Sequence, residues 1–153
     1  MGANFINTCL EEIAKTLEST SKLYADFISK NEFPEVVMSI LSNYVPECLV
    51  RAQVSCPVEK MSANGMDGKT FASKFVRAVE IAKVDKRRAV THNKGIMNGI
   101  DALIVATGND FRSVEAGIHA YASKDGNYTS LTDAKLENGN FIFSIEIPLA
   151  IGT

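Results

Sequence analysis

The chain has no tryptophan, few prolines and few cysteines, and it has no long apolar run. Its three cysteines, Cys9, Cys48 and Cys56, show neither CxxC spacing nor a pairing with histidine that would suit a metal. The longest apolar run, residues 102–106, is far shorter than a membrane span. These absences argue against a disulfide scaffold, a metal site and a membrane protein. We therefore expect a cytoplasmic chain whose thiols lie in or near the core.

An excess of one charge is also missing. The 153 residues include 16 Lys and Arg against 18 Asp and Glu, and the two signs are interspersed. Such a balance creates no long-range field that would attract a polyanion, so we expect no nucleic-acid partner. The apolar fraction of 46% is typical of a globular chain whose core needs no disulfide or metal for stability.

Apolar periodicity predicts a mixed chain of the α/β or α+β class. Asn109 or Asp110 is expected to cap a helix, Gly99 to end one, and Asn138-Gly139 to turn a hairpin. The predicted helices are 4–23, 35–43, 69–84, 89–98 and 110–123, and the predicted strands are 48–58, 100–107 and a terminal hairpin between about 126 and 147.

Four polar residues between positions 85 and 110 form the candidate site. Lys94 and Asn98 share one face of the predicted helix, and Arg88 lies one and a half turns earlier. Asp110 follows the predicted strand 100–107, at the edge where open α/β sheets bind ligands, so it can approach Lys94. A lysine kept protonated by an aspartate can stabilise an oxyanion, which indicates carbonyl chemistry. The alternative is a set of solvated or structural ion pairs.

These same residues carry a resemblance to a known family. The segments RAVTHNKGIMNGID (88–101) and ATGND (106–110) are similar to hydroxymethylglutaryl-CoA reductase (HMG-CoA reductase) of the bacterial class II type. The Met1-Gly2 pair resembles part of that family's Asp-Ala-Met-Gly cofactor motif, and the likeness continues through Asn43 to the Glu-Ile-Pro-Leu that begins at Glu146. It covers essentially the whole chain.

The resemblance implies a reaction and roles for the four site residues. NAD(P)H would reduce the thioester of 3-hydroxy-3-methylglutaryl-CoA in two hydride steps, giving mevalonate and CoA, or the reverse. Lys94 matches the catalytic lysine and Asp110 the aspartate that tunes it. Arg88 matches the arginine that holds the substrate carboxylate, and Asn98 the asparagine beside the reacting carbonyl.

The resemblance also implies a cofactor site and an assembly. Met1, Gly2 and Asn43 match positions that line the dinucleotide site, and family members build their active site across a subunit interface, which implies a homodimer or an assembly of dimers. Residues 1–50 would belong to the small NAD(P)-binding domain and residues 51–153 to the large substrate domain. No residue is expected to bind a metal.

Parts of the family pattern are missing from the chain. The Asp-Ala that should precede Met1, the N-terminal glutamate of the active site and the histidine of the C-terminal segment have no counterpart. We therefore expect a central fragment that is inactive alone. The alternative is a short natural protein that uses the reductase scaffold as a non-catalytic ligand-binding or subunit-assembly module.

Overall fold

The structure, a computed structural model, describes residues 2–151. The chain divides into two compact units, one ending at Ser42 and the other running from Asn43 to Ile151. Each unit is described by itself. None of the helices within residues 2–151 combines the length and apolar character that a membrane crossing requires.

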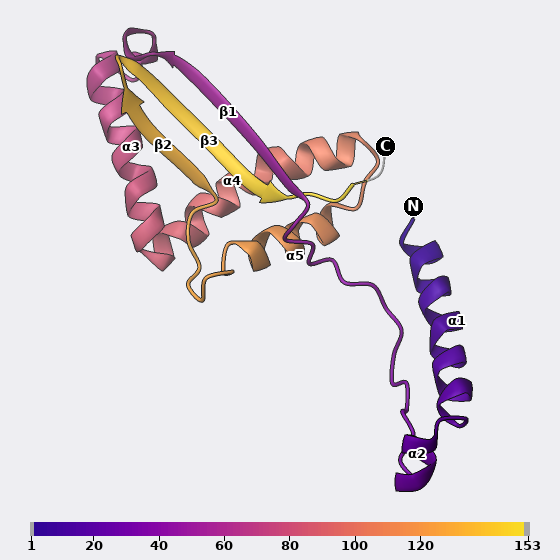
Figure 1. Ribbon diagram of the computed structural model, residues 1–153. Coiled ribbons are helices and arrows are strands. Elements are labelled where there is room, and N and C mark those ends of the chain that lie inside the picture. The colour runs from indigo at the N-terminus through magenta and orange to yellow at the C-terminus, as the bar shows by residue number, and fades with distance from the viewer. Residues whose placement is uncertain (1, 152–153) are drawn as a thin grey trace. The chain divides into compact units, whose positions relative to one another are not determined.

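The first unit contains two helices, α1 (Ala3–Ser21) and α2 (Ala25–Lys30). Helix α1 confirms the predicted helix 4–23, but its apolar residues are not enclosed: Phe5, Ile13 and Leu17 are 57%, 61% and 50% exposed. Ser21 is the one fully buried side chain among those described in this unit. The unit, drawn in indigo and violet in Figure 1, therefore has no hydrophobic core of its own.

The predicted helix 35–43 is wrong, because the described chain has no regular structure between α2 and the first strand. Helix α2 ends at Asn31 in the left-handed conformation, with φ of 55°. Side chains of α1 then bind backbone amides of the extended segment. Glu18 Oε1 accepts from Val36 N at 3.0 Å, and Asn7 Oδ1 accepts from Leu41 N at 2.9 Å. These side-chain acceptors satisfy backbone amides of a segment that has no regular structure to bond them.

The second unit is built on a three-stranded antiparallel sheet in the order β1-β3-β2. Its strands are β1 (Leu49–Pro57), β2 (Thr132–Glu137) and β3 (Asn140–Pro148), which confirms the predicted strand 48–58 and the terminal hairpin. Asn138 and Gly139 both have positive φ, 49° and 77°, as the type I′ turn of a two-residue hairpin requires.

Helices cover one face of this sheet (Figure 1). A short 3-10 helix, η1 (Val58–Met61), precedes α3 (Gly68–Val84), α4 (Lys86–Ala106) and α5 (Phe111–Tyr121). Aspartates at positions 67, 85 and 110 cap the three long helices, each accepting a hydrogen bond from a first-turn amide. Because helices pack on an antiparallel sheet, the unit belongs to the α+β class.

Two predicted elements merge into the single helix α4. The sequence predicts that Gly99 ends a helix and that a strand over 100–107 follows, yet α4 continues to Ala106 and the glycine with positive φ is Gly108, at 73°. The apolar run is short enough to fit either element. Burial along α4 follows the helical period: Met97 and Ile104 are buried and Ile100 is partly buried, three or four residues apart, whereas Leu103 and Val105 are exposed.

Two apolar clusters join the helices to the sheet. Helices α4 and α5 pack on the end of β3 around Met97, Ile118 and Ile147. Helix α3 packs on β2 and β3, where the Phe75 ring meets Phe141 edge-on with centroids 5.1 Å apart. The thiols contribute little, because Cys9 and Cys48 are exposed and only Cys56 is partly buried. The expectation of core or near-core cysteines is therefore wrong for the first two.

Candidate functional site

Side chains on the inner face of α4 bind the segment that leads into β2 and the first residue of that strand. Asn93 is fully buried, and its side chain donates to Thr129 O at 2.9 Å and accepts from Leu131 N at 3.1 Å. His92 Nε2 lies 2.7 Å from Thr132 Oγ1. The Asn93 bonds satisfy backbone groups next to the sheet, and together with the His92–Thr132 side-chain contact they set the rotation of α4 about its own axis.

That rotation places two of the predicted site residues on the exposed face. Lys94 and Asn98 are both exposed and lie one turn apart, about 6 Å along the helix. Arg88, also exposed, is turned roughly 120° about the axis from Lys94, so it lies on the flank of that face. The structure thus brings Lys94 and Asn98 together and sets Arg88 beside them.

Asp110 lies elsewhere. It caps α5, where its Oδ1 accepts from Arg112 N at 3.1 Å and pairs with Arg112 Nε at 3.3 Å. The side-chain hydrogen bond from Arg112 is the main cause that lowers the Asp110 pKa. Asn109 N donates to Ile104 O, and Ile104 lies about 15 Å along α4 from Lys94. Because the preceding segment is helix and not strand, the sheet edge expected to bring Asp110 to Lys94 does not exist among residues 2–151.

The predicted cofactor residues fall in different units. Gly2 is the exposed N-cap of α1, and no atom lies within 4 Å of the place where a β-carbon would stand. Asn43 is exposed and begins the second unit, and its carbonyl oxygen lies 2.8 Å from the β-carbon position of Gly117 on α5. Met1 lies outside the described residues.

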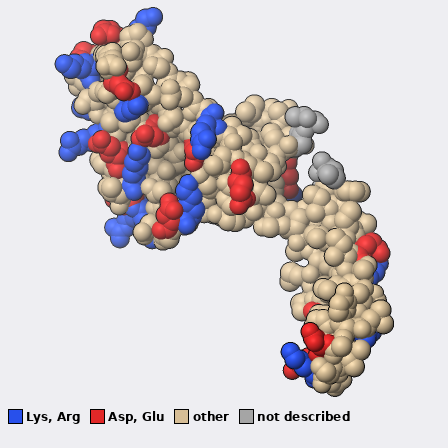
Figure 2. Space-filling view, in the orientation of Figure 1, with Lys and Arg blue, Asp and Glu red and all other residues tan. Residues whose placement is uncertain are grey.

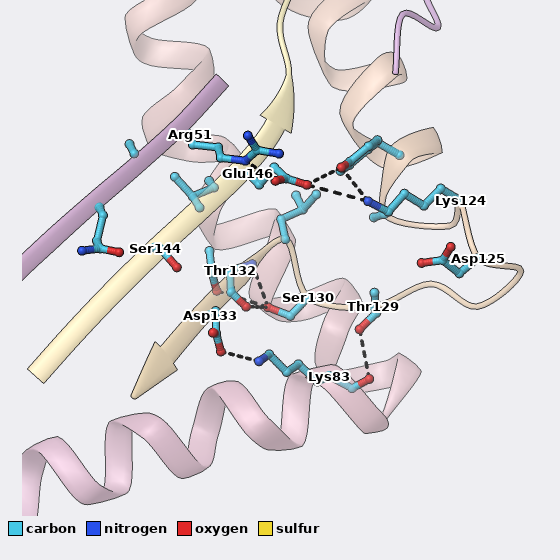
Figure 3. Close-up of a pocket in the computed structure, with 16 residues that line it drawn as sticks. Arg51, Lys83, Lys124, Asp125, Thr129, Ser130, Thr132, Asp133, Ser144 and Glu146 are labelled. Atoms are coloured by element: carbon cyan, nitrogen blue, oxygen red, sulfur yellow. Dashed lines mark hydrogen bonds and ion pairs between the residues drawn. The ribbon is translucent and has the colours of Figure 1, made fainter. Parts of the chain in front are cut away.

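A cavity of about 500 Å³ lies at the sheet end of the second unit, and none of the predicted site residues that the structure describes lines it. Figure 3 shows Glu146 in the lining of this cavity, between Arg51 and Lys124. Tyr121 Oη donates to Glu146 Oε1 at 2.5 Å, and the Arg51 Nε pairs with Glu146 Oε2 at 2.5 Å. The Tyr121 bond, followed by the Arg51 bond, lowers the Glu146 pKa. The positive charges of the cavity are therefore largely neutralised by carboxylates that also line it.

Positive and negative side chains are also mixed over the surface of the second unit. The visible face in Figure 2 shows Lys and Arg side chains interleaved with Asp and Glu over the sheet and α3. Within residues 2–151, no three His, Cys, Asp or Glu side chains are grouped so that they could hold a metal ion.

The partly buried His92 gives the fold a pH dependence. Burial lowers its pKa below the ordinary value, so the folded state binds this proton less readily than the unfolded state does. The contribution to stability is complete above about pH 6.5 and is lost as pH falls through the lowered pKa. We expect the Tm to fall between about pH 7.5 and 5.5, and His92→Asn to reduce this slope.

A control separates titration from hydrogen bonding. Thr132→Val removes the bond to His92 while leaving the imidazole partly buried, so the slope should persist at a lower Tm. Equal slopes in His92→Asn and the unaltered protein, measured by thermal unfolding, would assign the pH dependence to other groups.

Comparison with known proteins covers the whole chain. Residues 1–153 match the profile of the hydroxymethylglutaryl-coenzyme A reductase family. The 3-hydroxy-3-methylglutaryl-coenzyme A reductase of Archaeoglobus fulgidus is 39% identical over 153 aligned positions, and the alignment covers 99% of this chain and 31% of that protein. The probable reductase of Borreliella burgdorferi is 35% identical over 149 residues, covering 97% of this chain and 35% of that protein.

Solved structures agree with these matches. The reductase of Streptococcus pneumoniae superposes with a TM-score of 0.80 at 39% identity, covering 96% of this chain and 37% of that one. A structure of the class II enzyme from the same organism, described as bound to NADPH in open conformations, gives the same TM-score and identity. This chain spans about a third of the length of the relatives it matches, and it belongs to the hydroxymethylglutaryl-coenzyme A reductase family.

Proposed function

We propose that the protein containing this chain is an HMG-CoA reductase that converts 3-hydroxy-3-methylglutaryl-CoA to mevalonate and CoA, or catalyses the reverse. The observation that carries the proposal is the family match over all 153 residues, within which Lys94 and Asn98 share an exposed face of α4. An amine and an amide one turn apart can both reach a single carbonyl oxygen.

Each residue of this face suits one part of the substrate. The Lys94 ammonium would stabilise the oxyanion that forms when hydride adds to the thioester carbonyl. Asn98 would donate to the same oxygen. Arg88, on the flank of the face, would bind the terminal carboxylate of the substrate through its two-pronged guanidinium.

The first unit supports the proposal that NAD(P)H is the reductant. Gly2 leaves open space at the N-terminus of α1, where helix geometry favours a phosphate group. We assign Met1, Gly2 and Asn43 to the cofactor site, residues 1–50 to the small NAD(P)-binding domain and residues 51–153 to the large substrate domain. When bound, the nicotinamide supplies hydride.

The direct test is an assay of the full-length protein. Reduction of one thioester to an alcohol needs two hydrides and two protons, so two NAD(P)H should be oxidised for each CoA released. A ratio of one would indicate that reaction stops at the aldehyde, and no oxidation with this substrate would overturn the proposal. The chain of 153 residues alone is expected to show none.

The position of Asp110 leads to a proposal about assembly. About 15 Å of α4 separates the Lys94 level from the start of α5 in one chain, beyond the reach of either side chain. If Asp110 tunes Lys94, the aspartate must come from a second copy. We therefore propose a homodimer, or an assembly of dimers, with each active site formed by Lys94 of one copy and Asp110 of the other.

Subunit mixing tests this arrangement. We expect full-length Lys94→Ala and Asp110→Asn to be nearly inactive alone, and co-expression of the two to restore about a quarter of the activity. The reason is statistical, because half of the dimers would be mixed and each mixed dimer would contain one intact site of two. No recovery in demonstrably mixed dimers would place both residues in one subunit.

One measurement separates this proposal from a non-catalytic ligand-binding or assembly module. If the intact mass in the native source corresponds to a chain of several hundred residues, it supports the reductase. A mass of 16.6 kDa favours the non-catalytic module. We also propose a cytoplasmic location, which the three free thiols support. Fractionation of the source cells checks it.

A further inference from the structure

A glycine inside α5 lies against the backbone of the segment that leads to β1. Gly117 is buried, and a β-carbon placed on it would stand 2.8 Å from the Asn43 carbonyl oxygen and 3.9 Å from the carbonyl carbon. Both residues belong to the second unit. Real β-carbons essentially never come within 3.0 Å of another heavy atom in this way. The backbone at Asn43 can therefore take this place only because residue 117 has no side chain.

The helix itself does not call for a glycine at this position. Alanine is favoured over glycine inside a helix, and the φ of Gly117 lies outside the left-handed region that favours glycine. Gly95 and Gly99, which are also helical, have no atom within 4 Å of their β-carbon positions. The close approach of Asn43 is what distinguishes residue 117 from these two glycines of α4.

The two sides of this contact are held with different firmness. Helix α5 is fixed by Val114, Ile118 and Tyr121, which are buried in the core cluster that it shares with α4 and β3. Asn43 is exposed and lies in the part of the chain between α2 and β1 that has no regular structure. A side chain at position 117 would therefore displace the backbone of Asn43 and leave the helix in place.

We propose that Gly117 is a positioning residue for the NAD(P)H site, because the room it leaves for the Asn43 carbonyl sets where the Asn43 side chain stands. The inference rests on the proposed function, in which Asn43 belongs to the cofactor site. An asparagine amide can donate to and accept from polar groups of a dinucleotide. Moving the carbonyl oxygen from 2.8 Å to the 3.4 Å of ordinary contact shifts Asn43 by about 0.6 Å. A hydrogen bond of about 3 Å is lost when it is stretched to about 3.6 Å.

The test is a double-mutant cycle in the full-length protein, measured as the Kd of whichever reduced nucleotide, NADH or NADPH, the unaltered protein binds more tightly. We expect Gly117→Ala and Asn43→Ala each to raise this Kd about tenfold, the factor that corresponds to one lost hydrogen bond. Adding Gly117→Ala to Asn43→Ala should change the Kd less than twofold, because the side chain through which it acts is gone. Gly99→Ala, the control with open space, should leave the Kd unchanged.

Thermal unfolding of the same proteins separates positioning from a loss of stability. Gly117→Ala should lower the Tm equally with asparagine or alanine at position 43, because the backbone carbonyl is present in both. Its effect on the Kd should appear only with asparagine. An equal effect on the Kd in both backgrounds, or unchanged binding in either single variant, would overturn the inference. A Gly117→Ala protein that fails to fold would do so too, since it would show that α5 gives way.

Failure of the proposed function gives a different result. An unaltered protein that binds the nucleotide but reduces no thioester would contradict the proposed reaction, and the cycle of Kd values would still decide the role of Gly117. An unaltered protein that binds neither nucleotide would overturn the cofactor site and the role of Gly117 together.

Discussion

Gly68→Ala is expected to lower stability by about 3 kcal/mol or more, a fall in Tm of roughly 6–12 °C. Gly68 is buried at the first position of α3. A β-carbon there would stand 1.9 Å from the Val58 carbonyl oxygen and 2.9 Å from its carbon. Both atoms belong to the backbone of η1, so no side-chain rotation can relieve the overlap, and α3 must move away from η1.

The matched control is the same substitution in an open position. Gly99 lies inside α4 with no atom within 4 Å of its β-carbon position, so Gly99→Ala should instead gain about 0.5–1 kcal/mol from the helix preference of alanine. Thermal unfolding of the two variants measures the contrast. Equal Tm values would show that α3 and η1 do not approach each other this closely.

Lys94→Ala is expected to reduce the turnover of the full-length protein by about 10²–10³, which corresponds to about 3–4 kcal/mol of barrier for one oxyanion donor. The fold should persist, because Lys94 is exposed and contacts no partner among the described residues through a hydrogen bond or ion pair. The loss should therefore appear in kcat and kcat/KM together, with the Tm unchanged.

Lys86→Ala is the control for charge and helix. Lys86 is exposed in the first turn of the same helix, two turns before Lys94, so its removal changes net charge equally and should leave turnover unaltered. Steady-state rates of NAD(P)H oxidation compare the two variants. A Lys94→Ala protein that turns over as fast as Lys86→Ala would remove Lys94 from the proposed chemistry.

Local patterns predicted much of the second unit. Alternation over residues 48–58 and the Asn138-Gly139 turn identified β1 and the hairpin, because both features are set by neighbouring residues. The run over 100–107 was misassigned because strand and helix periodicities differ little over so few residues. Burial decided between them, and burial depends on what α4 packs against.

The candidate site was predictable only in part, for the same reason. One helix places Lys94 and Asn98 together, so their spacing was sufficient. Asp110 was linked to Lys94 through a sheet edge that the fold does not contain. Asn93 carried a usable signal, since it recurs with Ala89 and Met97 at the buried spacing of α4, where a polar residue needs partners.

The strand order has a consequence for synthesis of the chain. Within residues 2–151, strand β1 pairs only with β3, from Leu49 opposite Pro148 to Pro57 opposite Asn140. At roughly 5–20 residues per second, the ribosome needs about 5–20 s to make the intervening chain. Throughout that time β1 has no partner strand, whereas β2 and β3 emerge together and can pair through their short turn. A nascent chain stalled before residue 140 would therefore present β1 as an open edge, the state in which strands of separate chains join.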